Sequence, residues 1–237
     1  MLNFLLPNEI WEDGPLAVLP KLLDPATRSR FAAGLAAYDL ELDKIHIAWT
    51  LSKENARHQG KLLSDYVAEM NLPAEEALCN LLIEERLAVL LVFNSGDDQL
   101  VHPFLAHDLY LMGSDGIFFE EGVIHPRMYG SSTRLLGPCV RDWKLFSLED
   151  AVYKLSGGPA ARFGLADRGI IRTGAFADLV VFDPKTVCDR ATYQDPHRYS
   201  VGIDHVVCNG VPIVRDGAPV ENLGSPYPGR AVRADRV

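Results

Sequence analysis

The sequence lacks the features that mark several common protein classes. Its 237 residues include four cysteines, which are far apart and form no CxxC pair: Cys79, Cys139, Cys188 and Cys208. This spacing argues against a zinc ribbon and a disulfide framework, and it fits a reducing compartment. Basic residues are outnumbered, with 23 Lys and Arg against 32 Asp and Glu and a formal net charge of −9. Because phosphate binding needs a basic face, the composition disfavours a nucleic-acid partner.

No stretch of the sequence is long and apolar enough to span a membrane. The longest apolar run covers residues 87–93, whereas a membrane helix needs about 20 such residues. The amino-terminal residues are apolar but have no basic region, and Pro7 and Glu9 interrupt them, which is untypical of a signal peptide. We therefore expect a cytoplasmic protein without a membrane partner. Its 48% of hydrophobic residues are typical of a globular chain with one or two domains.

The hydrophobic pattern predicts helices that alternate with strands through most of the first half of the chain. The expected helices are 24–38, 62–70, 73–85 and a short segment through Leu100 and Leu105, and the expected strands are 44–50, 87–93 and 109–112. Such alternation is typical of right-handed βαβ units and a parallel sheet. The polar residues at the ends of the strands, Thr50, Asn94 and Asp115, would then lie at one edge, where such folds bind ligands.

The later part of the sequence predicts one more helix and then a small β domain. Ser147 and Asp150 resemble a capping box at the start of a helix that runs to about residue 155. From about residue 172 the pattern has a period of two. It predicts a strand at 177–183 and a hairpin of 205–208 and 211–214 around Asn209-Gly210, a pair that supplies the positive φ of a tight turn. The expected domains are therefore 1–171 and 172–237.

The three strands expected in the first domain are too few for a closed barrel. An eight-stranded α/β barrel needs about eight strands and ~250 residues. Three buried strands left open would expose two apolar edges, which folded proteins avoid. Either the sheet is smaller than the pattern indicates, or the chain forms part of a larger fold.

Several motifs resemble the N-acyl-D-amino-acid deacylase (D-aminoacylase) family of the amidohydrolase superfamily. The most specific are Gly113-Ser-Asp-Gly116 and the loop His125-Pro-Arg-Met-Tyr-Gly130; the run Ala177-Asp-Leu-Val-Val-Phe-Asp183 is shared more widely in the superfamily. The resemblance is strong from about residue 109 to 217 and fainter from 5 to 93. It implies an α/β fold, namely the C-terminal half of a (β/α)8 TIM-type barrel followed by a small β-sandwich.

The resemblance also implies a reaction and a cofactor. The family hydrolyses the linear amide of an N-acylated D-amino acid to a carboxylate and a free amino acid. Its zinc polarises the amide carbonyl and lowers the pKa of a bound water to about 7. By motif position, Asp115 is a metal ligand and the catalytic residue that takes the proton of the water and later passes one to the leaving amine. The family's histidine pair, cysteine ligand and later histidine ligands have no match in this sequence.

The loop expected over residues 116–130 supplies the candidate substrate-binding residues His125, Arg127 and Tyr129. Arg127 could hold the carboxylate of the substrate through a bidentate fork. Alternatively, His125 and Arg127 orient a structural loop, Tyr129 packs against the fold, and Asp115 is the residue of an ordinary Ser-Asp-Gly turn. His46 could face a barrel and bind a metal, but the apolar residues on both sides of it favour a place in the core.

Three hypotheses remain for the chain as a whole. It is the C-terminal half of a metal-dependent deacylase that acts on a small N-acyl amino acid, or one subunit of a split enzyme whose partner chain supplies the early strands and ligands. The third hypothesis is a non-catalytic remnant kept as a folded module, which could be a homo-oligomer. The sequence does not select the acyl group or the amino-acid side chain.

Overall fold

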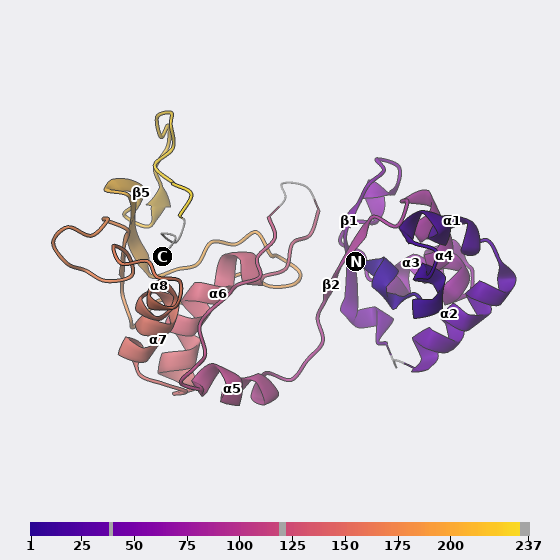
Figure 1. Cartoon of the computed structure of the whole chain (residues 1–237), viewed down its shortest axis with the longest axis horizontal. Helices are drawn as coiled ribbons and strands as arrows, with labels where there is room; N and C mark the ends of the chain where they lie inside the picture. The colour runs from indigo at the N-terminus through magenta and orange to yellow at the C-terminus, as the bar shows by residue number, and fades with distance from the viewer. Residues whose placement is uncertain (38–39, 119–121, 233–237) are drawn as a thin grey trace. The chain divides into compact units, whose positions relative to one another are not determined.

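A computed structural model describes residues 1–37, 40–118 and 122–232 of the chain (Figure 1). The chain divides into two compact units. The first comprises Met1–Gly96 and Ile117–His125, and the second comprises Asp97–Gly116 and Pro126–Val237. The chain therefore leaves the first unit, begins the second, and returns to the first for one short segment. The division into residues 1–171 and 172–237, which the change in hydrophobic pattern indicates, stays a prediction.

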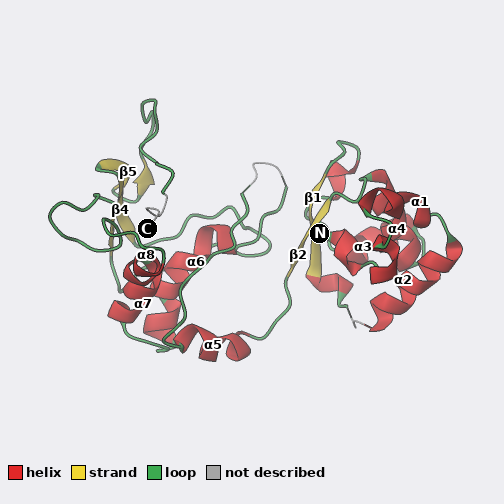
Figure 2. Ribbon diagram, in the orientation of Figure 1, coloured by secondary structure: helices red, strands yellow, loops and turns green. Residues whose placement is uncertain are grey.

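The first unit combines helices with a two-stranded sheet, and in the view of Figure 2 the helices lie on one side of the strands. The helices are α1 (Val18–Lys21), α2 (Pro25–Ala37), α3 (Leu63–Met70) and α4 (Ala74–Glu84), and the strands are β1 (Ile45–Thr50) and β2 (Val89–Phe93). Short 3-10 turns lie at Leu2–Leu5, Asn8–Trp11, Pro15–Ala17, Leu42–Lys44 and Asn55–His58. The predicted helices and strands of this part are confirmed, except that the expected helix end at Tyr38 lies outside the described residues.

The two strands of the first unit run antiparallel, so the predicted parallel sheet is wrong here. Thr50, the last residue of β1, pairs with Val89, the first residue of β2. Two helices, α3 and α4, connect the strands and contact one another, and a pair of helices returns the chain to the end of the sheet that it left. Consequently Thr50 and Asn94 lie at opposite ends of the pair and do not form the predicted common edge.

The buried carboxylate of Glu85 accepts hydrogen bonds from the segment that follows β1. Glu85, directly after α4, has no solvent-exposed surface. Its Oε2 accepts from the backbone N–H of Ser52 (2.8 Å), and its Oε1 accepts from Ser52 Oγ (2.5 Å) and from Asn55 Nδ2 (2.7 Å). A buried charge is tolerated only where such hydrogen bonds replace water. Glu85 thereby joins the end of α4 to the turn after β1.

The second unit combines four helices with a four-stranded antiparallel sheet. The helices are α5 (Asp98–Ala106), α6 (Arg127–Leu136), α7 (Leu148–Leu155) and α8 (Gly157–Arg162), with a π-helical turn at Pro138–Asp142; the strands are β3 (Leu179–Phe182), β4 (Ile203–Cys208), β5 (Val211–Arg215) and β6 (Ala218–Pro219). The sheet follows chain order. The capping box of Ser147 and Asp150 is present, and Asn209 and Gly210 both have positive φ in the β4–β5 turn, so both predictions are confirmed.

Two predictions for the second unit are wrong. Residues 109–112 form no strand, because within the described part of the chain no other strand pairs with them, and the Leu109 side chain is 84% exposed. The loop expected over residues 116–130 contains the first turn of α6, which begins at Arg127. The strands among the described residues form neither a barrel nor a two-sheet sandwich. None of the described helices combines the length and the apolar character that crossing a membrane would require.

Candidate functional site

Asp115 lies in a tight turn that packs close to the start of α6. Asp115 has a φ of +47°, a conformation that aspartate adopts more readily than most residues. The Gly116 N–H donates to Ser114 Oγ (3.1 Å). A Cβ at Gly116 would lie 2.8 Å from the Met128 sulfur, so a larger residue would shift the Met128 side chain. The Asp115 side chain is 78% exposed and accessible to a ligand.

The structure brings Asp115 together with Arg127, the first residue of α6. The Arg127 Nη2 lies 2.6 Å from the Asp115 Oδ2, which is a close ion pair. An exposed pair of this kind contributes only ~0.2–1 kcal/mol to folding stability. Its significance is therefore geometric, because it sets the predicted base and the predicted carboxylate-binding residue side by side.

Tyr129 and His125 have separate surroundings. The Tyr129 ring packs edge-on against Tyr199, with centroids 5.5 Å apart, and lies 6.0 Å from the His197 ring. The Tyr129 carbonyl accepts from Ser200 Oγ (3.0 Å), which ties α6 to this segment. His125 belongs to the first unit. The substrate-binding roles of His125, Arg127 and Tyr129 stay predictions.

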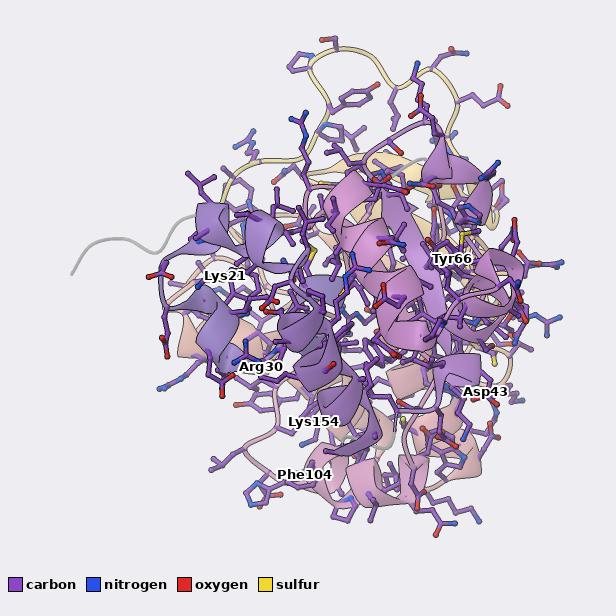
Figure 3. The ribbon with its side chains drawn as sticks, turned by 90° about the vertical axis from the view of Figure 1, so that its right-hand side faces the viewer. Lys21, Arg30, Asp43, Tyr66, Phe104 and Lys154 are labelled. Carbon is purple, nitrogen blue, oxygen red and sulfur yellow. The ribbon has the colours of Figure 1, made fainter. Side chains whose placement is uncertain are left out.

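A buried lysine that sequence reasoning missed supports the segment before Asp115. Lys154 on α7 is 5% exposed, and its Nζ donates to the carbonyl of His107 (2.6 Å). Its own carbonyl accepts from the Met112 N–H (3.1 Å). The ammonium also lies 5.7 Å from the Tyr110 ring; Lys154 is labelled in Figure 3. Because charged residues are usually exposed, no signal in the sequence indicated that this lysine is buried.

Replacing Lys154 by methionine is expected to loosen residues 107–112. The change removes a charged donor from the His107 carbonyl, and such a hydrogen bond is worth ~1.5–3 kcal/mol. We expect a loss of that size in the free energy of unfolding, measured with urea, and faster amide hydrogen exchange at Met112. The exposed Lys185→Met is the matched control, for which we expect neither effect. Unchanged exchange at Met112 in Lys154→Met would show that Lys154 does not hold this segment.

The donor set of the described residues does not fit a catalytic zinc site. Such a site needs about three protein ligands and a water, yet residues 1–37, 40–118 and 122–232 contain no group of three His, Cys, Asp or Glu side chains that could hold a metal. The carboxylate of Asp115 is paired with Arg127. His46 is buried in the first unit, and its Nδ1 lies 3.1 Å from the Gly60 carbonyl. Further ligands would have to come from elsewhere.

Comparisons with known proteins find relatives in one enzyme group. Residues 106–214 match the model of an amidohydrolase family. The N-acyl-D-glutamate deacylase of Alcaligenes xylosoxydans xylosoxydans is 38% identical over 195 residues, which cover 82% of this chain and 37% of the relative. The D-aminoacylase of the same organism is 48% identical over 122 residues (52% and 25%), and its N-acyl-D-aspartate deacylase is 37% identical over 197 residues (81% and 38%).

A solved structure agrees with these relatives. The crystal structure of N-acyl-D-glutamate deacylase from Bordetella bronchiseptica, in complex with zinc and a phosphonate mimic of the tetrahedral intermediate, matches with a TM-score of 0.65 at 37% identity. The match covers 76% of this chain and 37% of that one. The chain therefore spans less than two fifths of the length of these relatives. Over the part that it spans, the chain is related to the N-acyl-D-amino-acid deacylases, the family that its motifs resemble.

Proposed function

We propose that the chain works in a metal-dependent amidohydrolase of the N-acyl-D-amino-acid deacylase type. The observation that carries this proposal is the 37–48% identity to deacylases, together with the contact between Asp115 and Arg127. The substrate is a linear amide, an N-acylated D-amino acid, and the products are a carboxylate and a free amino acid. Zinc, which the Bordetella bronchiseptica relative binds, would polarise the amide carbonyl.

In this proposal Asp115 moves the protons of the reaction. The oxygen of a water adds to the amide carbon while the Asp115 carboxylate accepts a proton from that water. The carbon–nitrogen bond then breaks, and the proton passes from Asp115 to the nitrogen of the leaving amine. Arg127 binds the carboxylate of the amino-acid part. Because Arg127 contacts Asp115, a carboxylate bound there would lie near the proposed base.

The missing ligands make a further segment part of this proposal. Only Asp115 of the predicted residues belongs to the family's metal set, and the described residues offer no three-ligand group. We propose that the remaining ligands and strands come from a segment that corresponds to the unmatched part of the deacylases, either on the same polypeptide or on a partner chain. The same observation favours a second candidate, a non-catalytic module that binds no zinc. The cytoplasmic location stays a prediction.

The decisive experiment measures zinc content and amide hydrolysis in the same samples. The chain is assayed with zinc, alone and together with a chain that carries the unmatched part of an N-acyl-D-glutamate deacylase. The substrates are N-acetyl-D-glutamate, N-acetyl-D-aspartate and N-acetyl-D-leucine, each beside its L-enantiomer. Release of the D-amino acid with about one bound zinc per chain supports the proposal. No zinc and no release in either sample would overturn it in favour of the non-catalytic module.

A further inference from the structure

A cavity of about 270 Å³ lies in the second unit, away from Asp115 in the sequence. Three parts of the unit line it. They are the segment after α8 with Leu165, Asp167 and Arg168, the aromatic residue Phe176 before β3, and the end of the described chain with Arg230 and Val232. The volume is below the ~300–1,000 Å³ of pockets for drug-sized molecules. The cavity therefore suits a small molecule.

One of its two arginines is a structural part of the wall. The guanidinium of Arg168 lies 4.2 Å from the centre of the Phe176 ring. Its Nη1 pairs with Asp178, and its Nη2 donates to Asn209 Oδ1 (3.2 Å). The charge of Arg168 is thus compensated inside the protein, and the residue fixes the ring that forms one side of the cavity.

The second arginine approaches the same ring from the end of the described chain. The guanidinium of Arg230 lies 5.5 Å from the centre of the Phe176 ring. This end is tied to the β4–β5 turn, because Asn209 Nδ2 donates to the carbonyl of Pro228. Asn209 therefore holds Arg168 directly and holds the segment that carries Arg230 through Pro228. These two contacts support a defined shape for the cavity.

Two opposite charges line the cavity without neutralising each other. Arg230 and Asp167 are both exposed, and among the described residues neither forms an ion pair, with each other or with a third group. The lining side chains of Leu165, Phe176 and Val232 are apolar, and Arg168 is already paired with Asp178. One cation, one anion and an apolar wall are the complement of a molecule that carries both charges and a hydrocarbon group.

We propose that this cavity binds a free amino acid as a zwitterion. Arg230 holds the carboxylate, Asp167 holds the ammonium, and an apolar side chain lies against Leu165, Phe176 and Val232. An N-acylated amino acid has no ammonium, so the cavity distinguishes the product of the proposed reaction from its substrate. The choice of ligand rests on the proposed function, whereas the binding itself does not require turnover. The cavity is thus a binding site for the released amino acid that is separate from the proposed catalytic residues.

Isothermal titration of the full chain with leucine, as separate D- and L-enantiomers, tests the proposal. We expect saturable binding of at least one enantiomer, and at least tenfold weaker binding of the corresponding N-acetyl-leucine. Asp167→Asn and Arg230→Gln are each expected to weaken leucine binding by at least tenfold. The matched controls Asp204→Asn and Arg162→Gln change the same charges at exposed positions outside the cavity lining and are expected to bind like the parent chain.

The outcomes separate this inference from the proposed function. Absence of saturable leucine binding up to its solubility limit overturns the inference, as does equal binding of N-acetyl-leucine, which would indicate an anion site only. Equal weakening by the control variants also overturns it. An unchanged melting temperature of Asp167→Asn shows that lost binding is not lost folding, and a chain that ends at Gly229, which removes Arg230 and Val232, is expected to lose binding too. Leucine binding by a chain without amidase activity would reject the proposed function and keep the inference.

Discussion

The Asp115→Asn variant is expected to release the free amino acid from N-acetyl-D-amino acids about 10²–10⁴-fold more slowly than the parent. An amide has the size of a carboxylate but cannot accept the proton of the attacking water, and positioned proton transfer contributes a factor of about that size. The measurement is the rate of amine release by the zinc-loaded protein in whichever sample, chain alone or with its partner, is active.

A matched variant shows whether the loss is specific to this carboxylate. Asp108→Asn changes an exposed aspartate in the same segment and is expected to keep the parental rate. Folding should survive in Asp115→Asn, because the exposed pair with Arg127 contributes little to stability. A variant Asp115→Asn that is folded and hydrolyses the amide at the parental rate would reject the role proposed for Asp115.

The Glu85→Ala variant is expected to lower the free energy of unfolding by ~3 kcal/mol. The change leaves the buried amide of Asn55 and the partly buried donors of Ser52 without their shared acceptor, and each unsatisfied buried group costs ~1–3 kcal/mol. Urea unfolding followed by circular dichroism measures the loss. Glu84→Ala is the matched control, since the adjacent Glu84 is exposed and accepts one bond from Asn55 (3.0 Å). Equal, small losses in both variants would show that the Glu85 network does not stabilise the fold.

The same network predicts the pH dependence of stability. Burial raises the pKa of Glu85, but the hydrogen bonds from Ser52, Asn55 and the backbone of Leu51 outweigh it and leave the pKa below its ordinary value of 4.5. Because the folded pKa is lowered, the stabilisation is complete above the unfolded pKa and is lost as the pH falls through the folded pKa. The difference in unfolding free energy between the parent and Glu85→Gln should therefore shrink below pH 4.5. A difference that stays constant there would contradict an ionised Glu85.

Local sequence patterns predicted the helices and the hairpin. The strand direction in the first unit and the strand pairing of residues 109–112 were predicted wrongly, because they depend on contacts between distant residues. The capping box at Ser147 and the Asn209-Gly210 turn are determined by neighbouring residues, so the sequence was sufficient for both. The direction of β2 depends on how α3 and α4 pack, which no periodicity encodes. Residues 109–112 have the apolar pattern of a strand, but a strand also needs a partner to pair with.

The same distinction applies to the candidate site. The motif that contains Asp115 and Arg127 could be found from the sequence, and the structure places these two side chains in contact. The buried partners Lys154 and Glu85 could not, because their acceptors and donors lie about 47 and 30 residues away in the chain. Charged residues are usually exposed, so a pattern of residue types gives no reason to place them in the interior.

The return of the chain to the first unit has a consequence for protein synthesis. Ile124 is 1% exposed, and the Val123 N–H donates to the carbonyl of Ala48 (2.9 Å). On the ribosome these residues emerge only after the first residues of the second unit. At ~5–20 residues per second, Val123 is therefore synthesised several seconds after β1, and only then can its N–H donate to the Ala48 carbonyl. A nascent chain that stops at Gly96 would therefore present the Ala48 carbonyl without that donor and leave the buried position of Ile124 unfilled, so the first unit completes its packing only after part of the second unit has been made.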